Sequence, residues 1–302
     1  MTGARRAGSL TVPAEDGVPL HVELDGDPDA ALTVVLTHGF TASSAEWGAQ
    51  LPVLRDRARV VLWDHRGHGR SGWTRLTKAT IDQTGRDLAA VLDATAPTGP
   101  VVLAGHSMGG MTIMALARQR PELFGPRVVG VFLLATSAGG LVRTGALGRW
   151  VALLRGLGLL PLWLASLERA APYLERRRRR GSPAGRRFIR RYLFGRDDAD
   201  PAHVRQVQEL LERTPYPVTM AFYATFLDHD EEAALAVLRR VPVTVVAAAH
   251  DRLTPARHAR RIAELTGGVE LVVVPGAGHA VNLTRPDPVN AALTGLLDRV
   301  AG

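Results

Sequence analysis

Six short apolar runs, rich in β-branched residues, recur along the 302-residue chain and constrain its fold more than any other feature. Because they lack polar alternation, these runs suit strands that are buried on both faces of a sheet. Segments of helical character separate several of them and supply the crossovers that parallel strands require. The pattern predicts an α/β protein with a doubly wound, mostly parallel sheet. The runs are residues 33–37, 60–63, 101–104, 128–134, 243–248 and 271–274.

Two regions depart from this pattern. Residues 10–24 alternate and contain the turn signal Asp16-Gly17, which predicts an antiparallel hairpin at one edge of the sheet. Between residues 139 and 232 the strand pattern disappears, and segments of helical character rich in Leu, Ala and Arg take its place. We therefore predict a core formed by residues 1–138 and 233–302, with residues 139–232 inserted as a helical cap, or lid.

One serine has the setting of a catalytic nucleophile. The sequence Gly105-His106-Ser107-Met108-Gly109 follows an apolar run and precedes a helical segment. In this strand–turn–helix context, small neighbours permit a sharp turn that exposes the hydroxyl at a helix N-terminus, where N–H groups favour negative charge. The alternative is a serine that only caps the next helix.

A serine nucleophile needs a base, and the base needs an orienting acid. His279 follows the last apolar run, and Asp251 follows the run at residues 243–248. Both would lie with Ser107 at the carboxyl edge of the sheet, and the order Ser, Asp, His is the one associated with a nucleophile elbow. We predict Ser107, Asp251 and His279 as a catalytic triad, with His250 as a weaker alternative base.

These motifs resemble those of the α/β-hydrolase superfamily, in its serine esterase, lipase and cofactor-free haloperoxidase-like branch. The resemblance covers nearly the whole chain outside the predicted cap and includes His38-Gly39-Phe40 and the sequence DHRGHGRS at residues 64–71. In that family the oxyanion hole is formed by the N–H of the residue after the nucleophile and the N–H after His-Gly. The resemblance therefore implies the backbone N–H groups of Met108 and Phe40.

The resemblance also implies a reaction without cofactor or metal, in which Ser107 attacks the carbonyl carbon of a small ester-like molecule. A carboxylic ester hydrolase with a hydrophobic acyl or alcohol group is the favoured function. The same triad serves acyl transfer, perhydrolysis and carbon–carbon bond hydrolysis in related proteins, and the motifs do not separate these reactions. A non-enzymatic ligand receptor on the same fold is less favoured, because all three triad residues are present.

Four more histidines lie close to these motifs. The resemblance implies that His38, His65 and His68 brace loops around the site, so we expect hydrogen-bonded scaffold residues and no metal. His106 directly precedes the nucleophile, where a structural role is also the expectation.

The predicted cap combines apolar and basic residues. Its apolar positions are too numerous for one amphipathic stripe, so we expect them to pack on the core, to cover Ser107, or both. Arginines at 176–180, 186, 187, 190 and 191 carry much of the net charge of +8. We expect a solvated surface there, with docking to an acidic substrate or a membrane as the alternative. The apolar positions are Leu153, Leu154, Leu157, Leu159, Leu160, Leu162, Trp163, Leu164 and Leu167.

Composition excludes some rival functions. The chain contains 0 cysteines, which removes disulfides, thiolate metal sites and a cysteine nucleophile and is compatible with a reducing cytoplasm. Neither a secretory signal nor a continuous membrane-spanning stretch is recognisable, so we expect a cytoplasmic protein without stable membrane insertion. The basic balance comes without a nucleic-acid motif, and we expect no nucleic-acid partner. The sequence does not determine the oligomeric state.

Overall fold

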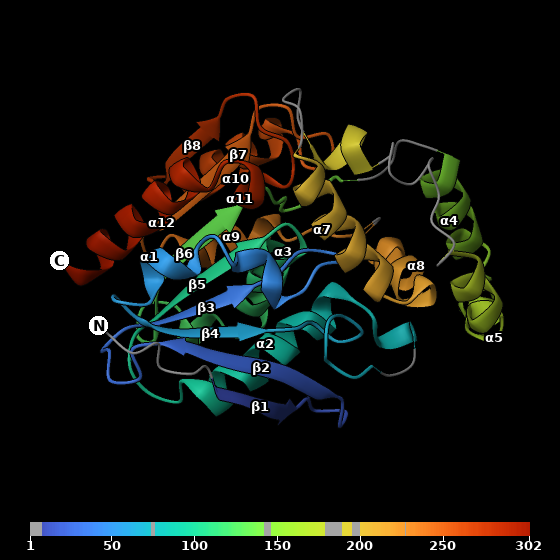
Figure 1. Ribbon diagram of the computed structural model, residues 1–302, viewed down its shortest axis with the longest axis horizontal. Coiled ribbons are helices and arrows are strands. Elements are labelled where there is room, and N and C mark those ends of the chain that lie inside the picture. Colours follow the sequence, from blue (N-terminus) through green and yellow to red (C-terminus); the bar gives the residue numbers. More distant parts are fainter. Residues whose placement is uncertain (1–7, 74–75, 142–145, 179–188, 195–199, 227) are drawn as a thin grey trace.

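A single eight-stranded sheet forms the centre of the computed structural model, which describes residues 8–73, 76–141, 146–178, 189–194, 200–226 and 228–302 (Figure 1). The strand order is β1-β2-β4-β3-β5-β6-β7-β8. The strands are β1 Gly8–Pro13, β2 Pro19–Gly26, β3 Thr33–Thr37, β4 Arg59–Trp63, β5 Val101–His106, β6 Val128–Leu134, β7 Val243–Ala248 and β8 Glu270–Val274.

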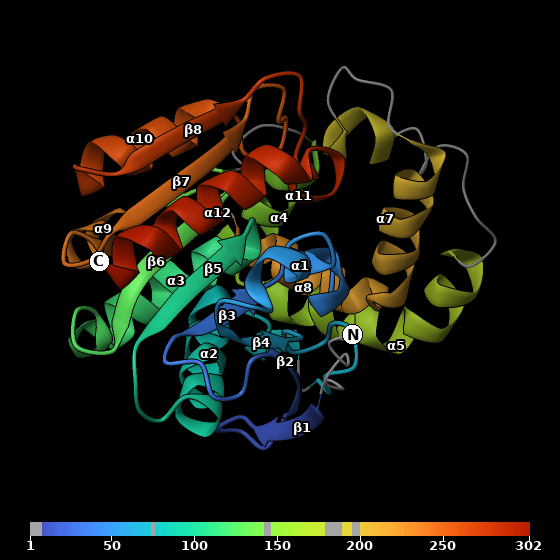
Figure 2. The ribbon, with the colours of Figure 1, turned by 60° about the vertical axis from the view of Figure 1, so that its left-hand side comes forward.

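Helices cover both faces of this sheet (Figure 2). The α-helices are α1 Leu51–Leu54, α2 Ile81–Thr95, α3 Met108–Gln119, α4 Ala146–Gly156, α5 Leu160–Arg178, α7 Pro201–Arg213, α8 Tyr216–Thr225, α9 Leu235–Leu238, α10 Ala256–Thr266, α11 Val281–Thr284 and α12 Pro286–Ala301. The described residues also form the short 3-10 helices η1 Ser44–Trp47, η2 Leu76–Lys78, η3 Pro121–Leu123 and η4 Glu232–Ala234. Residues 189–193 are also helical.

The pairing confirms the predicted α/β class with its doubly wound, mostly parallel sheet. From β4 to β8 in the sheet order, neighbouring strands run parallel. The predicted edge hairpin is confirmed, since β1 pairs antiparallel with β2, with Leu10 opposite Val22. One expectation was too strong: β8 is buried only at its end, because it is an edge strand with a neighbour on one side.

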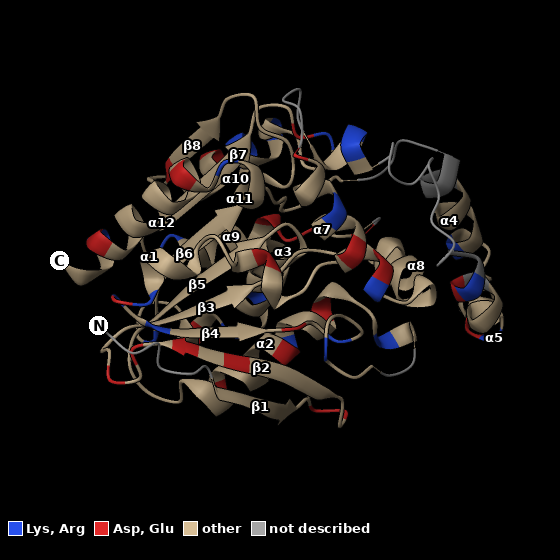
Figure 3. Cartoon of the chain, viewed as in Figure 1, with Lys and Arg blue, Asp and Glu red and all other residues tan. Residues whose placement is uncertain are grey.

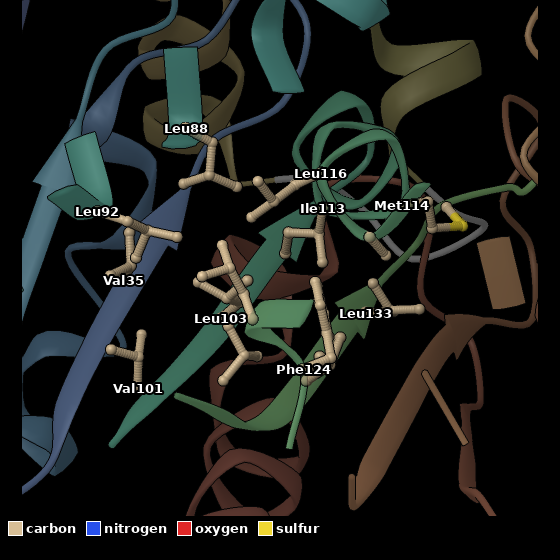
Figure 4. Close-up of a cluster of buried hydrophobic side chains, with 14 of the residues drawn as sticks. Val35, Leu88, Leu92, Val101, Leu103, Ile113, Met114, Leu116, Phe124 and Leu133 are labelled. Carbon is tan, nitrogen blue, oxygen red and sulfur yellow. The ribbon is translucent and has the colours of Figure 1, made fainter. Parts of the chain in front are cut away.

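The core lies in two layers because alternate residues of each strand point to opposite faces. Val35 of β3 and Leu103 of β5 pack against Leu88 of α2 and Ile113 of α3 on one face (Figure 4). On the other face, β-strand side chains pack against α12, α11 and the segment around Trp47. The two layers fix the strands, so the loops at their carboxyl ends are held on rigid supports.

Helices α4, α5, α7 and α8 occur between β6 and β7, in the segment where the sequence lost its strand pattern. The two ends of this insertion lie together, because Gly139 forms an antiparallel bridge with Asp230 and Glu231 N–H donates to the Ala138 carbonyl. We propose on this basis that residues 139–232 are a cap on a core formed by residues 1–138 and 233–302.

The apolar residues of α4 and α5 divide between two environments. Leu154 and Leu164 are buried, as expected for packing on the core. The expectation was wrong for Leu153, Leu157, Leu159 and Leu162, which are 52%, 61%, 42% and 69% exposed. These side chains lie on the outer surface of the helices, where the core does not reach. Within the described residues, no helix combines the length and the apolar character needed to cross a membrane.

Candidate active site

Ser107 occupies a sharp turn between β5 and α3. Its backbone adopts φ 52° and ψ −114°, in the left-handed region that a non-glycine residue rarely enters. The turn brings α3 so close to β3 that a Cβ atom on Gly109 would lie 2.1 Å from the Thr37 carbonyl oxygen. This geometry is the nucleophile elbow that the motif predicts. The Ser107 side chain does not cap α3, so the alternative role is wrong.

Three polar side chains form a chain of hydrogen bonds at the carboxyl ends of β5, β7 and β8. His279 Nε2 lies 2.9 Å from Ser107 Oγ, and His279 Nδ1 lies 2.7 Å from Asp251 Oδ2. A carboxylate only accepts, so Nδ1–H donates to Asp251 and Nε2 is left to accept the Ser107 proton. All three residues are buried. The structure thus brings the three predicted triad residues together.

Asp251 is held as an anion by its surroundings. Its Oδ1 atom accepts the backbone N–H groups of Leu253 at 2.7 Å and Thr254 at 2.9 Å. Burial alone would raise its pKa, but the His279 imidazole and the donors of Thr254 outweigh burial and hold the pKa of Asp251 below its ordinary value. An ionised Asp251 fixes the His279 tautomer needed to accept a proton from serine.

The His-Gly-Phe loop after β3 lies directly against the elbow. A Cβ atom on Gly39 would be 3.3 Å from Ser107 Cβ and 2.9 Å from His106 Nδ1. Phe40 is the next residue, and Met108 is the first residue of α3. The two backbone N–H groups that the family resemblance implies therefore belong to residues adjacent in the chain to Gly39 and to Ser107, which lie close together.

Glu46 is a buried acid that sequence reasoning missed. It lies in η1, is 4% exposed, and its Oε1 accepts the Gly39 N–H at 2.8 Å. His106 Nδ1 lies 3.2 Å from each Glu46 carboxylate oxygen, and His106 Nε2 lies 3.1 Å from the His279 carbonyl oxygen. Both ring nitrogens face acceptors, so both donate and the ring is an imidazolium. Glu46 and His106 thus link the Gly39 loop to the His279 loop.

The pKa of His106 reflects this pairing. Burial alone would lower it, but the charge and the hydrogen bonds of Glu46, helped by the His279 carbonyl, raise the pKa of His106 above its ordinary value. A Glu in a run of small and apolar residues offered no local signal for this role. Only the fold brings Glu46 to a histidine that is distant in sequence.

His38, His65 and His68 are buried scaffold residues with hydrogen bonds to backbone. His38 Nδ1 donates to the Gly39 carbonyl at 2.7 Å, and His38 Nε2 accepts the His65 N–H at 2.9 Å. Burial drives the pKa of His65 well below its ordinary value and that of His68 to about 3, so both stay neutral. In the part of the chain that the structure describes, no group of three His, Cys, Asp or Glu side chains could hold a metal ion.

The motif loop after β4 is anchored by charge. Asp64 accepts the backbone N–H groups of Ser44 at 2.7 Å and Arg70 at 2.9 Å, which ties this loop to η1. The buried Arg66 makes two 2.6 Å bonds to Asp87 of α2 and reaches Asp16 in the edge hairpin. These contacts fix the loops beside the site.

His250, the weaker alternative base, donates its backbone N–H to the Ala277 carbonyl. The imidazole that lies within hydrogen-bond distance of Ser107 Oγ is that of His279.

This fold, with a serine on a strained strand-to-helix turn and a histidine facing it, defines the class of α/β hydrolases. The chain belongs to the alpha/beta hydrolase family, whose family model matches residues 34–292.

Three comparisons illustrate the family relationship. A RutD protein from Caulobacter sp. (strain K31), to which carbamate hydrolysis is ascribed, is 28% identical over 92% of this chain and 95% of its own length. A thermophilic esterase from Thermogutta terrifontis is 23% identical, with a TM-score of 0.76 over 97% of this chain and 99% of its own. A bromoperoxidase from Bacillus anthracis is 20% identical, with a TM-score of 0.75 over 96% of this chain and 100% of its own length. The chain is therefore a hydrolase of this family.

Proposed function

We propose that the protein is a serine hydrolase that cleaves carboxylic esters with a hydrophobic acyl or alcohol group. The observation that carries this proposal is the chain of hydrogen bonds from Asp251 through His279 to Ser107, at 2.7 Å and 2.9 Å. The strained backbone of Ser107 supports it, because strain of this kind is typical of a residue fixed for catalysis.

The geometry supports a two-step acyl transfer. Ser107 Oγ attacks the carbonyl carbon while His279 Nε2 takes the hydroxyl proton, and Asp251 stabilises the imidazolium that forms. His279 then gives this proton to the departing alcohol, which leaves an acyl group on Ser107. Water attacks this acyl-enzyme after His279 removes its proton, and the carboxylic acid leaves as Ser107 recovers its hydrogen.

The oxyanion of each tetrahedral intermediate requires donors near Ser107. We propose that the backbone N–H groups of Phe40 and Met108 supply them, since Met108 follows Ser107 in the chain and Phe40 follows Gly39, which lies close to Ser107. One donor of this type is worth about 2.7 to 4 kcal/mol of transition-state stabilisation.

The preference for a hydrophobic group rests on the side chains around the elbow. Met108 and Met111 belong to an apolar cluster with Leu164 of α5 and Phe222 of α8, and Phe40 packs against this cluster. Cap helices therefore supply apolar contacts beside the nucleophile, which favours an apolar part in the substrate.

The absence of cysteine is compatible with a reducing cytoplasm, where we propose that this reaction takes place.

Carbamate hydrolysis is a second candidate, favoured by the RutD relatives, of which one covers 92% of this chain. A carbamate presents a carbonyl carbon bonded to nitrogen and to oxygen, so the same attack by Ser107 would apply. Acyl transfer to an alcohol or to peroxide differs only in the molecule that meets the acyl-enzyme. Carbon–carbon bond hydrolysis uses the same triad on a different leaving group.

The test compares the wild type with Ser107→Ala on p-nitrophenyl esters from acetate to palmitate and on a p-nitrophenyl carbamate. We expect ester turnover that falls by a factor of about 10³ or more in Ser107→Ala. The control is Ser9→Ala, which removes an exposed hydroxyl from β1 and should retain wild-type turnover. Turnover of the carbamate alone would favour the second candidate. Ester turnover that persists in Ser107→Ala would reject both.

A further inference from the structure

The outer side of α5 presents apolar and basic side chains together. Leu162 and Tyr173 are 69% and 66% exposed, and Arg169 and Arg176 are also exposed. Residues 162, 169 and 176 are spaced by seven, so they lie on one side of the helix, with residue 173 between the last two. Leu164 points the other way, into the cluster with Met108. The outer side of α5 is therefore not needed for packing.

Helix α4 presents a similar outer side. Trp150 and Leu153 are 50% and 52% exposed, and Leu157, one residue beyond the helix, is 61% exposed. Spacings of three and four place these three side chains on one side. Of the eight large apolar side chains exposed among the described residues, six lie between residues 150 and 173. We call Trp150, Leu153, Leu157, Leu162, Arg169 and Arg176 the outer surface of the cap.

The sequence of these two helices and of the stretch that follows them is rich in arginine. Helices α4 and α5 contain six arginines against two glutamates, and the described basic residues of α5 are blue in Figure 3. In the sequence from 146 to 191 there are twelve arginines and two glutamates, a net charge of +10. The whole chain carries +8, so the remaining residues sum to −2. Residues 179–188, which hold part of the predicted arginine run, lie outside the described residues.

We propose that the outer surface of the cap docks on an anionic lipid bilayer. Exposed Trp and Leu side chains gain free energy when they enter the boundary between headgroups and acyl chains. Arginine side chains bind lipid phosphates while their aliphatic stems lie on the apolar layer. A second copy of the chain fits less well, because two surfaces with this excess of positive charge repel each other.

Docking would define the source of the substrate, a consequence that rests on the proposed function. The inner side of α5 contacts the cluster of Met108 and Met111 next to Ser107, whereas its outer side would face the bilayer. One helix thus separates the lipid from the apolar surroundings of the nucleophile. The substrate class is then an apolar ester dissolved in the membrane.

The experiment measures binding by the full-length Ser107→Ala protein, so that the result does not depend on turnover. The protein is sedimented with phosphatidylcholine vesicles, with and without about 30 mol% phosphatidylglycerol. We expect binding only to the anionic vesicles and release as salt is raised towards about 1 M. Failure to bind would overturn the docking proposal while leaving ester hydrolysis by the wild type intact.

Matched double variants separate the charge from the apolar contribution. Arg169→Ser with Arg176→Ser should weaken anionic binding by about tenfold or more, since each arginine near the surface contributes. Arg257→Ser with Arg260→Ser removes the same charge from exposed positions on α10 and should change binding little. Leu157→Ser with Leu162→Ser should weaken binding without altering its salt dependence.

Two outcomes would overturn the assignment of this surface to lipid. Equal loss of binding in the α10 and α5 arginine variants would mean that total charge alone attracts the protein. We expect light scattering to report a monomer; a dimer that dissociates in Leu157→Ser with Leu162→Ser would instead assign the surface to a second copy of the chain. Neither outcome requires an active enzyme.

Discussion

At the residue scale, the decisive feature is how buried charges are compensated around Ser107. Asp251 is balanced by His279 and by backbone N–H donors. Glu46 is balanced by His106 and by the Gly39 N–H. The first set supports the proposed proton transfer, and the second connects the two loops between which the substrate carbonyl would bind. Glu46 and His106 are positioning residues in this scheme, since neither contacts Ser107 Oγ.

We expect Glu46→Gln to lower kcat by about tenfold to a hundredfold with little change in KM. The neutral amide no longer stabilises the His106 cation by its charge, which weakens the link between the Gly39 and His279 loops and lets them shift relative to Ser107. Steady-state kinetics on a soluble ester checks this. Glu264→Gln, at an exposed position on α10, is the control. An increase in KM with unchanged kcat would contradict a positioning role.

The raised pKa of His106 predicts a pH-dependent contribution to stability. The folded-state pKa of His106 lies above the unfolded value of 6.5. The ion pair with Glu46 therefore stabilises the protein fully below pH 6.5, and this contribution is lost as the pH rises through the folded-state pKa. We expect the difference in unfolding free energy between wild type and His106→Gln to shrink from about pH 6 to about pH 9. Urea denaturation at both pH values measures it. A constant difference would contradict the assignment.

At the element scale, close contact between α3 and β3 sets the position of the elbow. We expect Gly109→Ala to destabilise the protein by about 3 kcal/mol or more, because the added methyl would overlap the Thr37 carbonyl. The control is Gly295→Ala inside α12, where the nearest atom is 3.9 Å away. It should stabilise the protein by about 0.5 to 1 kcal/mol, as expected for Ala in a helix. Thermal and urea unfolding would detect both changes. Equal effects would mean that α3 can move away from β3.

At the scale of the whole molecule, charge is distributed unevenly, since residues 146–191 sum to +10 and the remaining residues to −2. We expect turnover of a neutral soluble ester to change little with salt, since this substrate carries no charge. Turnover of an apolar ester in anionic vesicles should fall as salt rises, because screening shortens from about 10 Å at 0.1 M to 3 Å at 1 M. Parallel assays at several salt concentrations test this. Equal salt dependence for both substrates would argue against delivery from the bilayer.

The fold class and the three residues of the candidate triad could be predicted from the amino-acid sequence. Apolar β-branched runs separated by helical segments predict parallel strands, and parallel strands gather the residues that follow them at one edge. Ser107, Asp251 and His279 each follow such a run, so their proximity could be predicted without coordinates. The physical reason is that short stretches of sequence are enough to predict both the hydrophobic pattern of a strand and its direction.

Other features depended on tertiary structure alone. Glu46 and His106 are separated by 60 residues and become partners only because η1 folds beside the end of β5. The apolar residues of α4 and α5 read as one broad apolar segment, and only packing decided that Leu164 is buried while Leu162 is exposed. The sequence shows whether a side chain is apolar or charged. Only the folded chain determines which neighbours bury it away from water.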